Sequence, residues 1–337
     1  MPPQSRRDQA PAAQRFAATL AVAVLLLPAC AGRTGVVDAQ VGTLAAGTHE
    51  LTLRHGGRNR QYRVFVPQGR GIPLRPVMLA FHGGGGNARQ FQETAGLDAV
   101  AQREGFLVVY PDGIGVLSLH TWNAGGCCGR AMDRDIDDIG FVRGLLDELV
   151  RRAGADPRRI YATGHSNGAM MTYRVAAELG DRIAAAIPVG GAMHLERFTP
   201  VSPVPILHIH SVDDPRALYD GGEGPPFPGT ERTVVHKPVE AALAAWRQVN
   251  GCPQVPTTGR TLRGAATGAN AGQTATELRW EPCASGSPVV HWKLTGSGHG
   301  WPGQTQRVIR ESIIGPPTTL IDAAEEAWRF AAGFTKP

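Results

Sequence analysis

Residues 164–168, Gly-His-Ser-Asn-Gly, fit the pattern G-x-S-x-G, in which a serine stands on a sharp turn between a strand and a helix. An apolar run precedes the motif at 159–163, and a helical pattern begins near Asn167. A Cβ at either glycine would crowd the neighbouring strand and helix, so the two glycines let the turn expose the serine hydroxyl. We therefore predict that Ser166 is a nucleophile and that the Asn167 backbone N–H faces a developing oxyanion.

A serine hydroxyl is a weak nucleophile at neutral pH and needs a neighbouring base. His299 is the candidate, because it lies on a glycine-rich loop directly after the apolar segment 289–294. Among the eleven histidines it is the one with that placement. We expect His208 and His210, which alternate on one face of a predicted strand, to fill the core or its edge rather than to bind metal.

Two aspartates follow the predicted strand 204–210, in the segment His-Ser-Val-Asp-Asp-Pro. A carboxylate at this point of the fold can hold the imidazole of the base in the correct orientation. We expect Asp214 to take this role and Asp213 to be a capping or turn residue, with the reverse assignment as the alternative. The order serine, aspartate, histidine along the chain is that of the α/β-hydrolase fold.

A glycine-rich loop follows the predicted strand 76–82, with the sequence His-Gly-Gly-Gly-Gly-Asn at 82–87. In the α/β-hydrolase fold such a loop supplies the second oxyanion donor, because its glycines let the backbone N–H groups point at the substrate oxygen unobstructed. The alternative is a dinucleotide-binding loop of the form G-x-G-x-x-A at 83–88, with Asp112 ending the next strand. That alternative leaves the serine motif unexplained.

Apolar segments alternate with amphipathic ones along most of the chain, which is typical of a mostly parallel sheet with helices on both faces. The predicted fold class is therefore α/β. The segment 215–237 is rich in Pro and Gly and indicates a long loop of the kind that contacts substrate. No linker is visible, so we expect residues 48–337 to form one catalytic domain. The predicted strands are 61–66, 76–82, 106–110, 159–163, 183–189, 204–210 and 289–294, and the predicted helices include 138–152, 238–249 and 319–334.

The first thirty residues have the pattern of a targeting segment, with a basic start, an apolar run from Phe16 to Leu27, and then Pro-Ala-Cys. The apolar run is shorter than the ~20 residues that cross a bilayer as a helix. We expect residues 1–29 to be a lipoprotein-type signal peptide, Cys30 to be lipidated, and 30–47 to be a flexible lead. A plain secretory signal is the alternative, and either signal places the domain outside the cytoplasm.

The charge of the chain argues against a nucleic-acid partner. The chain has 34 Lys and Arg against 29 Asp and Glu, and residues 1–29 contain three of these arginines and one of the aspartates. The remaining excess of about three positive charges is too small to indicate nucleic-acid binding. The residues named above require no metal or organic cofactor, and none is predicted; a lipid at Cys30 is the expected contact with a membrane.

Four cysteines follow Cys30, and an even number in an oxidising compartment favours disulfides. We expect Cys252 to pair with Cys283, because the Gly- and Thr-rich segment 256–275 between them has little else to hold it. Cys127 and Cys128 are then either a vicinal pair or free thiols. Their spacing does not suit a zinc site.

Together these motifs resemble the poly(3-hydroxybutyrate) depolymerase and feruloyl esterase-like proteins, including lipoproteins of the LpqC type. The resemblance covers about residues 48–305, and it implies an α/β-hydrolase fold with the roles of nucleophile, acid and base on Ser166, Asp214 and His299 and an oxyanion donor at Gly84. The family segment around the acid is altered here to His-Ser-Val-Asp-Asp. The matching segments are His82-Gly83, Tyr110-Pro111-Asp112-Gly113, Trp122-Asn123, Cys127-Cys128-Gly129, Asp137-Asp138, 164–170 and 298–302.

The resemblance implies an exported serine ester hydrolase that acts on polyhydroxybutyrate-type polyesters and oligomers or on feruloyl esters. The alternatives are a serine peptidase of the same fold and a non-catalytic surface lipoprotein. Aromatic side chains suit both a ferulate ring and an aliphatic chain. Trp122, Trp301, Tyr219 and Phe227 are therefore candidates for the substrate pocket, with core packing as the other interpretation of the two tryptophans.

Overall fold

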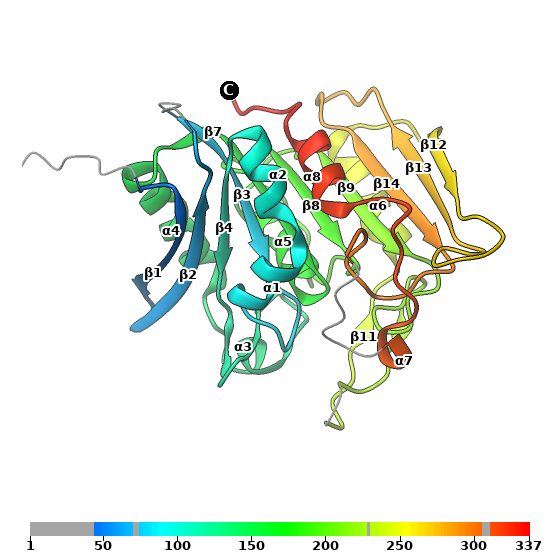
Figure 1. Ribbon diagram of the computed structural model, residues 1–337, viewed down its shortest axis with the longest axis horizontal. Coiled ribbons are helices and arrows are strands. Elements are labelled where there is room, and N and C mark those ends of the chain that lie inside the picture. Colours follow the sequence, from blue (N-terminus) through cyan, green and yellow to red (C-terminus); the bar gives the residue numbers. More distant parts are fainter. Residues whose placement is uncertain (1–43, 70–73, 228–229, 305–310) are drawn as a thin grey trace, which may run out of the picture. The chain divides into compact units, whose positions relative to one another are not determined.

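A ten-stranded sheet forms the centre of the computed structural model, which describes residues 44–69, 74–227, 230–304 and 311–337 (Figure 1). The predicted signal peptide and Cys30 lie outside these residues. No helix in the described ranges is long and apolar enough to cross a bilayer. In spatial order the strands are β1 (Gly47–His55), β2 (Arg58–Val66), β4 (Leu107–Pro111), β3 (Arg75–Phe81), β7 (Ala155–His165), β8 (Ala185–Val189), β9 (Ile206–Ser211), β14 (Val289–Thr295), β13 (Thr274–Trp280) and β12 (Thr257–Arg263).

The middle of the sheet is parallel, as the sequence predicts. Neighbouring strands from β4 to β14 run parallel, whereas β1, β2, β12 and β13 join the two edges in antiparallel pairs. Strands β4, β8 and β9 are buried along their whole length, which explains why β4 and β8 are continuous apolar runs in the sequence. All seven predicted strands are present.

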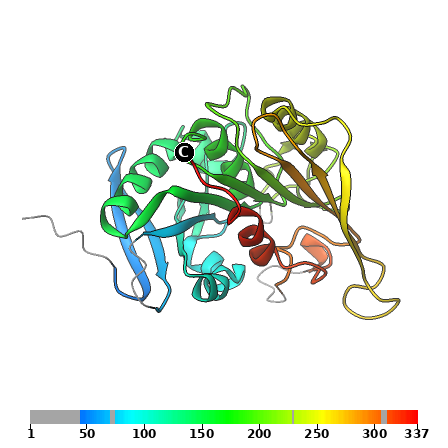
Figure 2. The same cartoon turned by 90° about the horizontal axis from the view of Figure 1, so that it is seen from above.

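Helices cover both faces of the sheet (Figures 1 and 2). On one face, α4 (Asp138–Arg152), α5 (Asn167–Glu178) and α6 (Val239–Asn250) contribute to one apolar core. On the other face, α1 (Ala88–Ala95), α2 (Leu97–Glu104) and α8 (Ala323–Ala331) contribute to a second core. Two short helices, α3 (Gly129–Asp133) and α7 (Glu311–Ile314), lie in loops. The predicted α/β class with a mostly parallel sheet is therefore confirmed.

Three strands at the edges of the sheet, β1, β12 and β13, were not predicted. Strand β1 has half-buried and exposed residues in alternation and β12 is almost fully exposed, so neither shows the apolar run of a buried strand. The segment 256–275 is consequently not a loose loop, because β12 and β13 pair across it as an antiparallel hairpin. Segment 215–237 is mostly loop as predicted, and within it β10 (Gly222–Glu223) pairs with β11 (Val235–His236).

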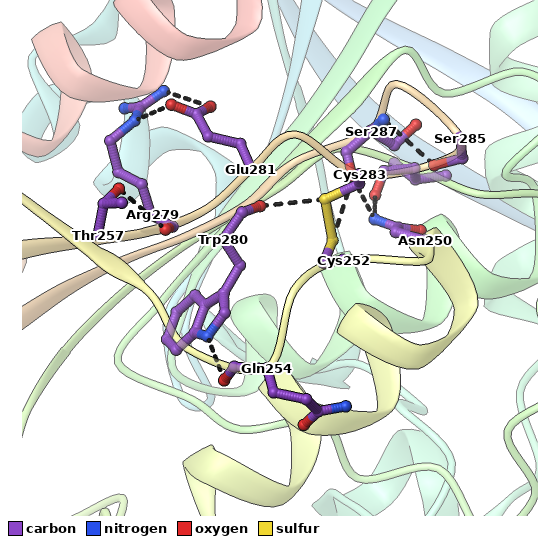
Figure 3. The surroundings of a disulfide bond; sticks show 11 residues. Asn250, Cys252, Gln254, Thr257, Arg279, Trp280, Glu281, Cys283, Ser285 and Ser287 are labelled. Carbon is purple, nitrogen blue, oxygen red and sulfur yellow. Dashed lines mark hydrogen bonds and ion pairs between the residues drawn. A yellow bond between two sulfur atoms is a disulfide. The ribbon is translucent and has the colours of Figure 1, made fainter.

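The structure contains the predicted disulfide between Cys252 and Cys283 (Figure 3). It joins the chain after α6 to the turn between β13 and β14. Beside it, the Asn250 side chain donates hydrogen bonds to the carbonyl oxygens of Val204 and Ser287, at 2.8 and 2.9 Å. The disulfide therefore joins two segments beside a junction that the hydrogen bonds of Asn250 already hold. Of the two alternatives for Cys127 and Cys128, the structure has the vicinal disulfide.

Residues at the start of α4 hold in place the loop that contains Trp122 and Asn123. Asp137 caps the helix by accepting a hydrogen bond from the Gly140 N–H at 2.8 Å. The next residue, Asp138, is fully buried, where it accepts from Arg60 at 2.6 Å and from the Asn123 N–H at 2.8 Å. The buried pair therefore fixes the backbone at Asn123, next to Trp122.

Candidate active site

Ser166 stands at the sharp turn between β7 and α5, as predicted from its motif. Its backbone has φ 57° and ψ −120°, a conformation that non-glycine residues rarely adopt and that clusters at functional sites. A Cβ on Gly164 would lie 2.4 Å from the Gly168 carbonyl oxygen, and one on Gly168 would lie 2.1 Å from that of Phe81. Both glycines are therefore required for the strand, turn and helix to approach so closely.

The structure brings Ser166, His299 and Asp214 into one hydrogen-bonded chain. The Ser166 Oγ lies 2.9 Å from Nε2 of His299, and Nδ1 of His299 donates to Oδ2 of Asp214 at 2.7 Å. Since Nδ1 carries the proton, the lone pair of Nε2 faces the serine hydroxyl. Asp214 and His299 are 4% and 8% exposed, so water has little access to the chain of bonds.

Asp214 is held at the end of β9 by three hydrogen-bond donors, and a fourth N–H group lies nearby. Its Oδ1 accepts from the backbone N–H groups of Arg216 and Ala217 at 2.7 and 2.8 Å, and its Oδ2 faces His299 and Nε2 of His210. Burial alone would raise the pKa of this carboxyl, but His299 and His210 outweigh burial and hold the pKa far below its usual range. Asp213 takes a different role, accepting from the Gly296 N–H at 2.6 Å.

His210 is a contributor that sequence reasoning did not assign to the site. Tyr173 donates to Nδ1 of His208 at 3.0 Å, Nε2 of His208 lies 3.1 Å from Nδ1 of His210, and Nε2 of His210 donates to the Ala217 carbonyl at 2.8 Å. One tautomer for each ring satisfies the whole chain of bonds. Both histidines are buried in the core as expected, and their chain of bonds ends beside Asp214.

The loop carrying His299 is held by the residue before the serine. Nε2 of His165 donates to the His299 carbonyl at 2.8 Å, and the His299 N–H donates to the Ile314 carbonyl. Burial and the nearby His299 lower the pKa of His165 to about 3, so its ring is neutral at physiological pH. These hydrogen bonds hold the glycine-rich loop after β14 in one conformation, although its glycines would allow the backbone many others.

The glycine-rich loop 83–86 lies against the serine turn. A Cβ on Gly84 would lie 3.5 Å from the Cβ of Asn167, and the Gly84 N–H has no acceptor within the described part of the chain. The N–H of Asn167 is at the first position of α5, where the helix offers it no acceptor. The side chain of Asn167 accepts from the Trp122 N–H at 2.7 Å, which fixes the Trp122 loop to the turn.

A group of His82, Asp112 and His120 braces this glycine-rich loop, and their potential metal-ligating atoms lie within 4.8 Å of one another. His82 donates from Nδ1 to the Gly83 carbonyl and accepts at Nε2 from the Gly113 N–H. His120 donates from Nδ1 to Asp112 at 2.7 Å and from Nε2 to the Leu117 carbonyl at 2.8 Å. No ring nitrogen is left to bind a metal ion. The His120 carbonyl accepts from the Gly85 N–H at 2.8 Å.

Both ring nitrogens of His120 face acceptors, which requires the imidazolium form. The hydrogen bond to Asp112 raises the pKa of His120, and the two histidines lower the pKa of Asp112 despite its burial. The stabilisation from His120 is complete below its unfolded pKa of 6.5 and is lost as the pH rises through the raised folded value. The stabilisation from Asp112 is present above 3.8 and is lost on acidification.

We therefore expect His120→Gln to lower the free energy of unfolding at about pH 6 by about 1–3 kcal/mol, because Asp112 loses a charge-assisted hydrogen bond. The difference from wild type should shrink toward about pH 9. Urea unfolding at the two pH values measures it, with His49→Gln on edge strand β1 as the control. A difference that is the same at both pH values would show that the brace does not depend on the charge of His120.

A cavity opens at Ser166, and the loop 215–237 supplies much of its wall. Phe227 lines it, as expected. The pocket assignment of Trp122, Trp301 and Tyr219 is corrected, because none of the three is among the lining residues. Trp122 is fully buried, Trp301 donates to the Ala95 carbonyl at 3.0 Å, and Tyr219 donates to Glu240 at 2.6 Å. The lining residues are Cys128, Ser166, Asn167, Met170, Arg216, Ala217, Pro225, Phe227, Val234, His236 and His299.

His236 is a second lining residue that sequence reasoning missed. Burial, followed by the nearby His194 and His299, lowers the pKa of His236 to about 4. The ring is therefore neutral at physiological pH and offers the cavity a polar but uncharged group. It comes from β11, a two-residue strand inside the predicted loop, and the sequence carries no periodicity there that would have placed it.

The proteins that this chain resembles include two that are named as esterases. The protein named "Putative esterase NocK" of Nocardia uniformis subsp. tsuyamanensis is 30% identical over 285 residues, covering 82% of this chain and 80% of the relative. Feruloyl esterase B of Piromyces equi is 28% identical over 249 residues, covering 71% of this chain and 42% of the relative. The chain thus spans less than half of the second relative.

The fold also resembles that of a solved structure. The structure of an acetyl xylan esterase from Aspergillus awamori superimposes with a TM-score of 0.56 over 85% of this chain and 99% of that one, at 15% identity, which is a likeness in fold. The family model described as esterase PHB depolymerase matches residues 60–279, almost two thirds of the sequence. The chain therefore belongs to the esterase PHB depolymerase family and is a carboxylic ester hydrolase with the α/β-hydrolase fold.

Proposed function

We propose that the protein hydrolyses carboxylic esters through an acyl-enzyme. The Ser166 Oγ attacks the ester carbonyl carbon while Nε2 of His299 takes the hydroxyl proton, and His299 then returns that proton to the leaving alkoxide. Water, deprotonated by His299, releases the acid and restores the serine. Asp214 holds the imidazole, and the N–H groups of Gly84 and Asn167 bind the carbonyl oxygen as it becomes negative.

The observation that carries this proposal is the bonded chain from Ser166 through His299 to Asp214 on a strained turn. Its first bond measures 2.9 Å and its second 2.7 Å, within the range that proton transfer requires. The backbone at Ser166 adopts its positive φ at a cost of about 1–3 kcal/mol. Such strain is retained where the surrounding structure fixes it, and here the two glycines of the motif do so.

An alkyl fluorophosphonate tests the proposal directly, because it bonds covalently to an activated serine and loses fluoride. We expect one adduct, located by peptide mass spectrometry at Ser166, that forms at a rate slowed by a competing p-nitrophenyl ester. Heat-unfolded protein, in which the serine is no longer activated, is the control. Labelling at another residue, or equal labelling of folded and unfolded protein, would contradict the assignment of the nucleophile.

For the substrate we propose esters of hydroxyalkanoate polyesters or oligomers, or hydroxycinnamoyl esters. The name of the family and that of the Piromyces equi relative support these classes. The cavity wall supports them as well, since Met170, Phe227 and Val234 give it an apolar side beside the serine. The family assignment favours an esterase over the peptidase and the non-catalytic alternatives. The two disulfides are consistent with the export predicted from residues 1–29.

A further inference from the structure

Arg216 lines the cavity that contains Ser166 and His299. It lies two residues after Asp214, and its backbone N–H donates to Oδ1 of that aspartate at 2.7 Å. The position of Arg216 is therefore fixed relative to the serine by the same bonds that hold the acid. The side chain is half-buried, so its charge is only partly screened by water.

The guanidinium of Arg216 lacks an acidic partner. Its one hydrogen bond, at 3.0 Å, goes to the Pro226 carbonyl, and no Asp or Glu within the described ranges forms an ion pair with it. Arg232 on the same loop differs, because it pairs with Asp133 at 2.6 Å. Five N–H donors in a fixed plane suit a carboxylate, and most of those of Arg216 remain available.

The rest of the cavity wall contains no carboxylate that could compete for this cation. Its lining residues include no Asp or Glu among those the structure describes, and His236 is neutral. Arg216 is thus the permanently charged residue among the described lining residues, on a cavity wall that also includes apolar side chains such as Met170 and Val234. A negative group entering beside an apolar chain would meet both the charge and the apolar surface.

We infer that Arg216 binds a carboxylate of the substrate, so that the preferred esters carry a negative charge a few bonds from the ester that is cleaved. The inference rests on the proposed function of the same site and narrows its substrate class. A short hydroxyalkanoate oligomer with a free acid end has this character. A neutral alkyl ester of a hydroxycinnamic acid does not, so the two proposed classes become distinguishable.

Two esters of the same length test the inference. Monoethyl glutarate and ethyl pentanoate differ in that a carboxylate of the first replaces a methyl group of the second, and both release ethanol. We expect Arg216→Met to lower the ratio of kcat/KM for monoethyl glutarate over ethyl pentanoate by about 10- to 100-fold, the effect of one charge-assisted hydrogen bond. Arg216→Lys, which keeps the charge, should restore part of the ratio.

Arg232→Met is the matched control, since it removes a cation from the same loop outside the cavity lining, and it should leave the ratio unchanged. An unchanged ratio in Arg216→Met would overturn the inference, including the case in which both rates fall equally because the bond to Pro226 is lost. That outcome leaves the proposed function intact. Labelling of Ser166 by the fluorophosphonate fails only if the serine mechanism itself is wrong.

Discussion

Replacing Ser166 with alanine is expected to lower kcat/KM for p-nitrophenyl acetate by about 10⁴- to 10⁶-fold, because without Oγ no acyl-enzyme can form. The structure explains why no neighbour can substitute. The lone pair of Nε2 of His299 points at Oγ, whereas the hydroxyl group of Ser211, which also lies near this loop, donates to the Ser297 carbonyl. The residual rate should come from the oxyanion donors alone.

The alanine variant should fold as the wild type does. Alanine can adopt the same backbone conformation with strain similar to that of serine, and the two flanking glycines are untouched. We expect its thermal midpoint to be equal to or slightly above that of the wild type, since residues at active sites are often suboptimal for stability. Ser118→Ala, at an exposed serine in the turn between β5 (Ile114–Val116) and β6 (Leu119–Thr121), is the control. A well-folded Ser166→Ala with the wild-type rate would contradict the mechanism.

The parts of the site that could be predicted are those in which one residue type fits a fixed backbone position. The turn at Ser166 requires glycine on both sides, and the structure shows a backbone oxygen within 2.4 Å of where each Cβ would be. The central strands were predictable for a similar reason. Burial on both faces leaves room for apolar side chains alone, and this constraint is visible as a continuous run, as in 107–111.

The parts that could not be predicted depend on how a loop turns and on which distant segments meet. His210 approaches Asp214, four residues later, because the loop after β9 turns back, and His165 reaches the carbonyl of His299, 134 residues away in the sequence, across two strand ends. No local pattern records these contacts. The prediction of the pocket residues was wrong for a different reason, because a tryptophan side chain suits a buried core as well as a cavity wall. Trp122 and Trp301 lie in the core, where the indole N–H group of each donates a hydrogen bond to a backbone carbonyl.

Asp214→Asn should reduce kcat by about 10³- to 10⁴-fold while leaving KM nearly unchanged. The reason lies in the two backbone donors at this carboxyl. The N–H groups of Arg216 and Ala217 bind Oδ1 at 2.7 and 2.8 Å, so the asparagine oxygen will occupy that position and its amide nitrogen will face His299. A donor at Nδ1 forces the proton of the imidazole to Nε2, which then cannot accept the proton of Ser166.

Asp213→Asn is the matched control, because it makes the same chemical change at the neighbouring residue. Asp213 accepts from the Gly296 N–H, and an asparagine oxygen can do the same, so we expect kcat to fall by less than about fivefold. The two variants therefore decide between the two acids that the sequence left open. A severe loss in Asp213→Asn with a mild one in Asp214→Asn would exchange their roles. Equal losses would mean that both act by holding the loop before His299 rather than by setting its tautomer.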